Sequence, residues 1–218
     1  MGQPPPDTNS SRKQLRTALK HYWTMSGRID PPARAVRVPP KPRGICRAIE
    51  PDDARILVKT ALGWHPQGLA VLFGLYMALR AGEIASARWD RFSPEFDWYT
   101  VTGKGDVTAT IPVHPVLCAE LAGYQSAYVY LFPGSRRRAY VTATTVWQWT
   151  RDVAVEAGIG QIQTHQLRHT ALATANDATG DLRATQAFAR HARPETTAIY
   201  TRATAARLRA VVDALDYL

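Results

Sequence analysis

The sequence is short of cysteine, since only Cys46 and Cys118 occur among its 218 residues. Two cysteines form neither a disulfide framework nor a cluster of metal ligands. A long apolar run is also missing, because the longest one, residues 69–79, is interrupted by Gly74. Residues 1–6 lack the basic-then-apolar pattern of a signal peptide. We therefore expect no membrane segment and a reducing, cytoplasmic environment.

Acidic residues are outnumbered, with 18 Asp and Glu against 27 Lys and Arg, which gives a formal net charge of +9. This excess favours a polyanionic partner such as nucleic acid, although a basic globular protein with no such partner could share the composition. Hydrophobic residues make up 45% and charged residues 21%, which is typical of a chain that folds around a core. Its length suffices for one domain with an appendage.

The first 47 residues differ in composition from the rest. Apolar residues recur at helical spacing over residues 12–25, after an opening with three consecutive prolines. We interpret residues 1–30 as a disordered tail followed by a partial N-terminal helical segment. Five prolines between residues 31 and 44 predict an extended basic linker over residues 31–47. Its cations would lie along DNA phosphates or remain solvated, and they are Arg34, Arg37, Lys41 and Arg43.

Residues 48–218 are expected to form the main domain. A β-hairpin is predicted over residues 98–113, with a glycine-rich turn at its centre. Helices are predicted over residues 51–62, 66–79, from 83 onward, and over 144–156, 166–176, 181–189, 195–201 and 204–216. The predicted fold class is therefore mainly α with a small antiparallel β-sheet, an α+β fold.

The segment from Thr164 to Thr170 carries the most chemical information. His165 and Arg168 are three residues apart, so on a helix they share a face and could bind one anion. His165 and His169 could instead be zinc ligands, but Gln166 stands where a metalloprotease needs glutamate, and the sequence offers no further ligand cluster. We therefore predict neither a metal site nor another cofactor.

Residues 165–170, HQLRHT, resemble the central box of the tyrosine recombinase, or phage integrase, family. His191 and Tyr200, nine residues apart, resemble the last box of that family. Residues 74–89, GLYMALRAGEIASARW, resemble its first box, and a hairpin lysine, Lys104, lies between the first and central boxes. The resemblance covers about residues 50–203, and four signals in order are more specific than any one of them.

The resemblance implies an enzyme that cleaves DNA through a 3′-phosphotyrosyl bond and reseals it without ATP. The nucleophile would be Tyr200, and the cations Arg80 and Arg168 would neutralise the phosphate. Proton transfer and hydrogen bonding would fall to Lys104, His165 and His191. The supporting residues would be Glu83, which would orient the site or simply form a buried ion pair, and His169.

The resemblance also implies double-stranded DNA as the partner and a tetramer of this chain around it. The apolar stripe of Leu208, Val211, Val212 and Leu215 would pack on its own domain or dock on a neighbouring protomer. Integration or excision of a phage or mobile element, in the cytoplasm or nucleoid of a bacterial host, is the expected role. A basic loop could bind DNA or stay solvated, and it consists of Arg136, Arg137 and Arg138.

The sequence departs from the family pattern at three places. Arg190 stands where glycine commonly precedes the last-box histidine, residues 107–113 lack basic side chains, and the N-terminal segment is short. Two other functions remain open. One is a DNA-binding regulator that keeps the fold without cutting, and the other is a relaxase that resembles type IB topoisomerases.

Overall fold

The computed structural model describes residues 9–27, 48–103, 108–124, 127–135, 139–190 and 205–218. By its contacts the chain divides into two compact units, Met1–Ile45 and Cys46–Leu218. Helix α1 (Asn9–Met25) is the described part of the first unit, and it begins three residues before the predicted start. Within that unit, α1 leaves Leu15, Tyr22 and Met25 exposed.

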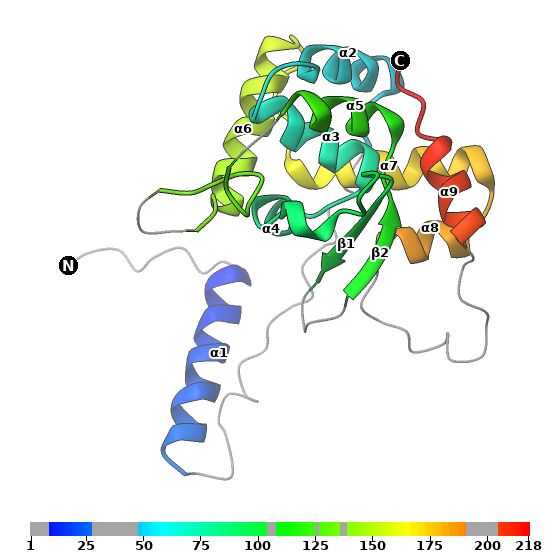
Figure 1. Cartoon of the computed structure of the whole chain (residues 1–218). Coiled ribbons are helices and arrows are strands. Elements are labelled where there is room, and N and C mark those ends of the chain that lie inside the picture. Colours follow the sequence, from blue (N-terminus) through cyan, green and yellow to red (C-terminus); the bar gives the residue numbers. More distant parts are fainter. Residues whose placement is uncertain (1–8, 28–47, 104–107, 125–126, 136–138, 191–204) are drawn as a thin grey trace. The chain divides into compact units, whose positions relative to one another are not determined.

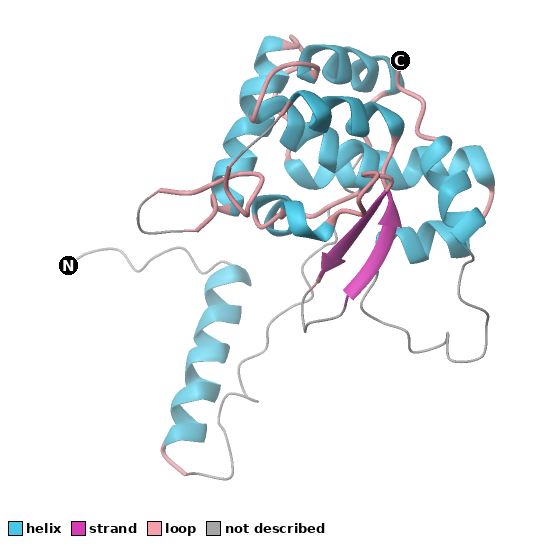
Figure 2. Ribbon diagram, viewed as in Figure 1, coloured by secondary structure: helices cyan, strands magenta, loops and turns pink. Residues whose placement is uncertain are grey.

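The second unit is mainly helical with two strands, so the predicted fold class is confirmed (Figure 2). Helices occur at most of the predicted positions, and their ends differ from the predicted ones by at most three residues. In chain order the elements are α2 (Pro51–Ala61), α3 (Gln67–Met77), α4 (Ala81–Ala85), η2 (Trp89–Arg91), β1 (Trp98–Thr102), β2 (Thr108–Pro112), α5 (Pro115–Gly123), α6 (Ala143–Glu156), α7 (Thr164–Thr179), α8 (Leu182–Ala189) and α9 (Ala205–Asp213).

Helix α3 forms the centre of the core. Every residue from Gly68 to Met77 is buried, and α3 packs against α2, α5, α6 and α7 (Figure 1). The helix is apolar on all sides because it is surrounded on all sides. It ends at Ala78, whose φ of 49° places the C-cap in the left-handed region.

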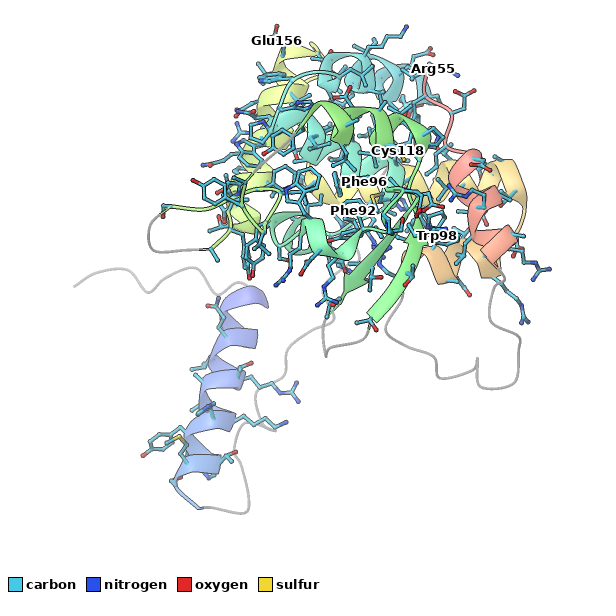
Figure 3. All side chains as sticks on the ribbon, viewed as in Figure 1. Arg55, Phe92, Phe96, Trp98, Cys118 and Glu156 are labelled. Carbon is cyan, nitrogen blue, oxygen red and sulfur yellow. The ribbon has the colours of Figure 1, made fainter. Side chains whose placement is uncertain are left out.

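The two strands pair in antiparallel register, from Trp98 opposite Pro112 to Thr102 opposite Thr108. The connecting residues 104–107, which include Lys104, lie outside the described residues. Aromatic side chains gather at the base of the hairpin, where the Phe92 and Tyr99 ring centroids are 4.5 Å apart (Figure 3 labels Phe92). Helix α5 follows and was not predicted. It begins with Pro115, and its cap is His114 Nδ1, which accepts a hydrogen bond from Val116 N at 3.3 Å.

The apolar stripe near the C-terminus is covered by its own unit. Val211, Val212 and Leu215 are fully buried, and α9 contacts α7, α8 and β2 (Figure 1). Arg209 of α9 donates to the carbonyl oxygens of Val113 and Asp97, at 3.1 and 3.2 Å. The expected helix over residues 195–201 lies outside the described residues. Among the helices that the structure describes, none has the length and apolar character to cross a bilayer.

Replacing Gly74 by alanine is expected to separate α3 from α7. The added Cβ would lie 2.8 Å from both Cβ and Cδ1 of Leu167, too close for a packed interface. We expect the free energy of unfolding to fall by about 1–3 kcal/mol, measured from the urea midpoint. Gly82→Ala is the matched control, because nothing lies within 4 Å of its added Cβ. Equal midpoints for the two variants would contradict the expectation.

Candidate active site

Arg168 lies in the second turn of α7, with only 2% of its surface exposed. Its Nη1 donates to the carbonyl oxygen of Ala78, and its Nη2 donates to that of Ala189. Ala78 caps the C-terminus of α3, and Ala189 is the last residue of α8. Carbonyl groups in the last turn of a helix lack partners within it and carry partial negative charge. Two helix ends therefore hold this buried cation.

Arg80 and Glu83 form a local unit at the start of α4. Glu83 Oε2 accepts a hydrogen bond from Arg80 N at 2.9 Å, and Glu83 Oε1 accepts one from Arg80 Nη1 at 2.7 Å. The Glu83 side chain is 8% exposed, whereas that of Arg80 is 41% exposed. The carboxylate thus fixes the direction of Arg80 and leaves its guanidinium within reach of a ligand. Glu83 takes part in a buried ion pair, which was one of its two predicted roles.

A third arginine, Arg190, belongs to the same cluster. Its Nη2 lies 3.0 Å from Glu83 Oε2 and donates to Ala78 O at 3.0 Å, while its Nη1 donates to Phe188 O at 2.9 Å. The residue has φ 51° and ψ 48°, the left-handed conformation that glycine adopts most readily. The departure from the family pattern at this position therefore leaves a glycine-like turn in place.

Sequence reasoning treated Arg190 only as a departure and missed it as a site residue. One signal was available, because a cation directly preceding the predicted site residue His191 is a candidate for the same anion site. Its contact with Glu83 spans 107 positions of the chain. No helical or strand spacing predicts such a contact.

His165, the second residue of α7, is exposed near these cations. Burial lowers its pKa from the ordinary 6.5, and the charges of Arg168, His169 and Arg80 lower it further. The imidazole is therefore mainly neutral at pH 7 and able to accept a proton. Among the described residues, no group of three His, Cys, Asp or Glu side chains could hold a metal ion. His165 and His169 thus have no third ligand in that part of the chain.

The arginine cluster carries more positive charge than its one carboxylate, Glu83, neutralises. Burial first, and then the charges of Arg190 and Arg80, lower the pKa of Arg168 to about 9, while the charge of Glu83 opposes them. Three guanidinium groups, each counted as a cation, and one carboxylate give the cluster a formal net charge of +2. Guanidinium groups match the oxygen atoms of a phosphate. The arrangement favours a bound phosphate group.

A cleft of about 230 Å³ opens beside Glu83. Its lining includes Arg88 and Arg91 from the segment after α4, together with Tyr130 and Tyr140. The Arg88 guanidinium lies 5.4 Å from the Tyr130 ring centroid and pairs with Asp90. Sequence reasoning missed this cleft because its walls come from segments that only the fold brings together.

The remaining predicted site residues lie outside the described part of the structure. Those with predicted catalytic roles are Lys104, His191 and Tyr200. Those predicted to bind DNA are Arg34, Arg37, Lys41, Arg43, Arg136, Arg137 and Arg138. The structure therefore brings together Arg80, Glu83, His165, Arg168 and His169, and it adds Arg190.

The Glu83 carboxylate should make acid unfolding steeper. Burial raises its pKa, but the charge of Arg190 and the hydrogen bonds from Arg80 outweigh this and lower the pKa below the ordinary 4.5. A carboxyl group with a lowered folded-state pKa stabilises the protein above its unfolded pKa, and this stabilisation is lost as pH falls through the folded pKa. We expect Glu83→Gln to lose about 1–3 kcal/mol at pH 7 and to depend less on pH below about 4.5. Urea unfolding at a series of pH values tests this, and parallel curves for the two proteins would contradict it.

Comparison with known proteins agrees with the geometry. The sequence profile of the phage integrase family matches residues 49–207. Tyrosine recombinase XerC of Xanthomonas campestris pv. campestris (strain B100) is 31% identical over 218 residues, which cover 94% of this chain and 67% of the relative. The structure of an integrase from mycobacterium phage Brujita superposes with a TM-score of 0.67 at 26% identity, covering 95% of this chain and 71% of that one. A lambda integrase tetramer bound to a Holliday junction shares the fold, with a TM-score of 0.61 at 14% identity over 88% of this chain and 59% of that one. The chain therefore belongs to the phage integrase family, the tyrosine recombinases.

Proposed function

We propose that this chain breaks and rejoins DNA through a covalent bond between Tyr200 and a backbone phosphate. Membership of the phage integrase family makes the chain a site-specific recombinase, a DNA strand transferase. The observation that carries the proposed site is a cluster of three arginines with one carboxylate: Glu83 binds both Arg80 and Arg190, and Ala78 O accepts hydrogen bonds from both Arg190 and Arg168. The proposed catalytic residues are Arg80, Lys104, His165, Arg168, His191 and Tyr200.

In the proposed cleavage step, the phenol oxygen of Tyr200 attacks the phosphorus atom and the bond to the 5′ oxygen breaks. The product is a 3′-phosphotyrosyl ester and a free 5′ hydroxyl group. The phenol proton passes to His165, and the leaving oxygen takes a proton from Lys104. Arg80 and Arg168 stabilise the negative charge on the non-bridging oxygens, with His191 adding a hydrogen bond. The ester keeps the energy of the broken bond, so the reverse attack reseals DNA without ATP.

The proposed partners are duplex DNA and further copies of this chain. The lambda integrase tetramer on a Holliday junction supports this proposal, because it has the same fold. In such an assembly α9 could dock on a neighbour only by leaving the surface of its own unit, where its stripe is now buried. Integration or excision of a phage or mobile element in a bacterial cytoplasm is the proposed setting, supported by the likeness to a phage integrase.

Tyr200→Phe should abolish the covalent adduct and leave DNA binding intact. The substrate is a nicked duplex that carries a site selected from random-sequence DNA by binding to this chain. The nick lets the short strand diffuse away after cleavage and so traps the ester, which is then seen on a denaturing gel. A wild-type protein that binds the site without forming an adduct would indicate a regulator. Relaxation of supercoiled plasmid without any selected site would indicate a relaxase.

Arg80→Ala should slow single-turnover cleavage of the same substrate by about 10²–10³-fold, the usual effect of removing one oxyanion donor. The fold should persist, because Arg80 is 41% exposed and Arg190 still pairs with Glu83. Thermal unfolding of the variant provides the control. An unchanged cleavage rate in a folded variant would remove Arg80 from the proposed mechanism.

A further inference from the structure

Arg190 combines a backbone conformation that disfavours arginine with a side chain that is almost fully buried. A left-handed conformation is unfavourable for an L-residue other than glycine. Its side chain is only 8% exposed, and a buried guanidinium is stable only where charges and acceptors surround it. The carbonyl oxygens of Met77, Ala78 and Phe188 and the Glu83 carboxylate provide these partners. The contacts of this side chain therefore offset the backbone strain.

The Glu83 carboxylate is shared between two arginine side chains that differ in exposure. Arg190 approaches Oε2 from the interior, since both side chains of this pair are 8% exposed. Arg80 binds Oε1 from the accessible side, where its own side chain is 41% exposed. If Glu83 had only Arg80 as a partner, that pair would be neutral. With Arg190 present the three groups carry a net charge of +1, and the accessible guanidinium keeps its attraction for an anion.

We propose that Arg190 is a positioning residue for the phosphate-binding arginines. It neutralises the Glu83 carboxylate from the buried side, so that this carboxylate orients Arg80 without cancelling its charge. This inference rests on the proposed function, because it assigns the phosphate to the cluster of Arg80 and Arg168. Arg190 also donates to Ala78 O, the carbonyl oxygen that accepts from Arg168. One side chain thus supports both of the other arginines.

The electrostatics of Glu83 agree with this division of roles. Burial raises the pKa of the carboxyl group, and the charge of Arg190 does more to lower it than any single interaction with Arg80. Of the two charge-charge interactions alone, the one with Arg190 lowers the pKa of Glu83 more than the one with Arg80. The cluster of Arg80, Glu83, Arg168 and Arg190 has a net charge of +2 with Arg190 and +1 without it.

Arg190→Gly tests the proposal in a variant that should still fold, because glycine adopts the left-handed backbone conformation without strain. We expect a folded protein whose single-turnover cleavage of the nicked selected site is about tenfold slower, a smaller loss than that of a direct oxyanion donor. Adding Glu83→Gln to Arg190→Gly returns the cluster to a net charge of +2. We expect this double variant to recover most of the lost rate, whereas Glu83→Gln alone leaves Arg190 buried without its counter-charge.

The matched control is Arg55→Gln, which removes one surface charge from α2. Arg55 is 51% exposed, and its ion pair within the described part of the chain is with the nearby Asp52. Helix α2 lies at the end of the unit away from the hairpin (Figure 3). We expect this variant to cleave at the wild-type rate. A wild-type rate in Arg190→Gly would overturn the proposal, and so would a double variant that recovers nothing, because the role of Arg190 would then be purely structural.

A second measurement separates this proposal from the function on which it rests. Binding of inorganic phosphate to the full chain is followed by NMR of the arginine side chains, which requires no DNA site and no cleavage. We expect Arg190→Gly to bind phosphate about tenfold more weakly and the double variant to recover the wild-type affinity. If the wild-type protein forms no adduct with DNA, the proposed function fails, and phosphate binding still decides the role of Arg190. Equal affinities in the wild-type protein and Arg190→Gly would overturn that role.

Discussion

The arrangement of the site depends on how the carbonyl groups at the C-terminal ends of α3 and α8 find hydrogen-bond donors in the interior, away from water. Ala78 O and Ala189 O both accept hydrogen bonds from the buried Arg168 guanidinium. Without that side chain, Ala189 O would lose its arginine donor and Ala78 O would keep only the one from Arg190, and a buried carbonyl group without a donor is unfavourable. Conversely, without the two helix ends, the interior could not hold the cation. The side chain proposed to bind phosphate is therefore also the one that joins α3, α7 and α8.

This dual role explains why the site remains positively charged in the free protein. The carbonyl groups supply hydrogen bonds and partial charge, but Glu83 is the one full negative charge among the described members of the cluster. Burial is the main cause of the lowered pKa values of Arg168 and Arg190, and the charge of Arg80 lowers both of them further. A phosphate group would relieve this excess of positive charge, and in a site of low dielectric constant the attraction is strong. Part of the affinity for an anion is thus built into the core before any ligand arrives.

Local features of this structure could be predicted from sequence, and contacts between distant segments could not. Apolar patterns and helix start signals located α2, α3, α6 and α7, and the i, i+3 spacing of Arg80 and Glu83 matches their 2.7 Å contact. Helix α5 was missed because its apolar residues form no clear face, so that only Pro115 marks its start. Spacing placed His165 and Arg168 on one face of the helix, yet His165 is exposed and Arg168 is buried. The packing of α3 and α8 decides which part of that face is covered, and spacing alone does not show it. The contact of Arg190 with Glu83 exists only in the folded chain, so no local pattern could indicate it.

Chain connectivity links the described cluster to the segments that carry the other proposed catalytic residues. Arg190 O accepts a hydrogen bond from Arg80 Nη2 at 3.5 Å, and His191 is the next residue, so the chain enters the segment of Tyr200 directly from the arginine cluster. That segment ends at α9, which packs on α8 and β2 (Figure 1). The hairpin that carries Lys104 includes the same β2, and β1 lines the cleft beside Glu83. The segment with Tyr200 therefore begins after α8 and ends at α9, and the segment with Lys104 joins β1 to β2. In both cases the two flanking elements contact each other. In the proposed mechanism, a cluster with an uncompensated charge of +2 at this junction would give a DNA phosphate a defined position relative to all of them.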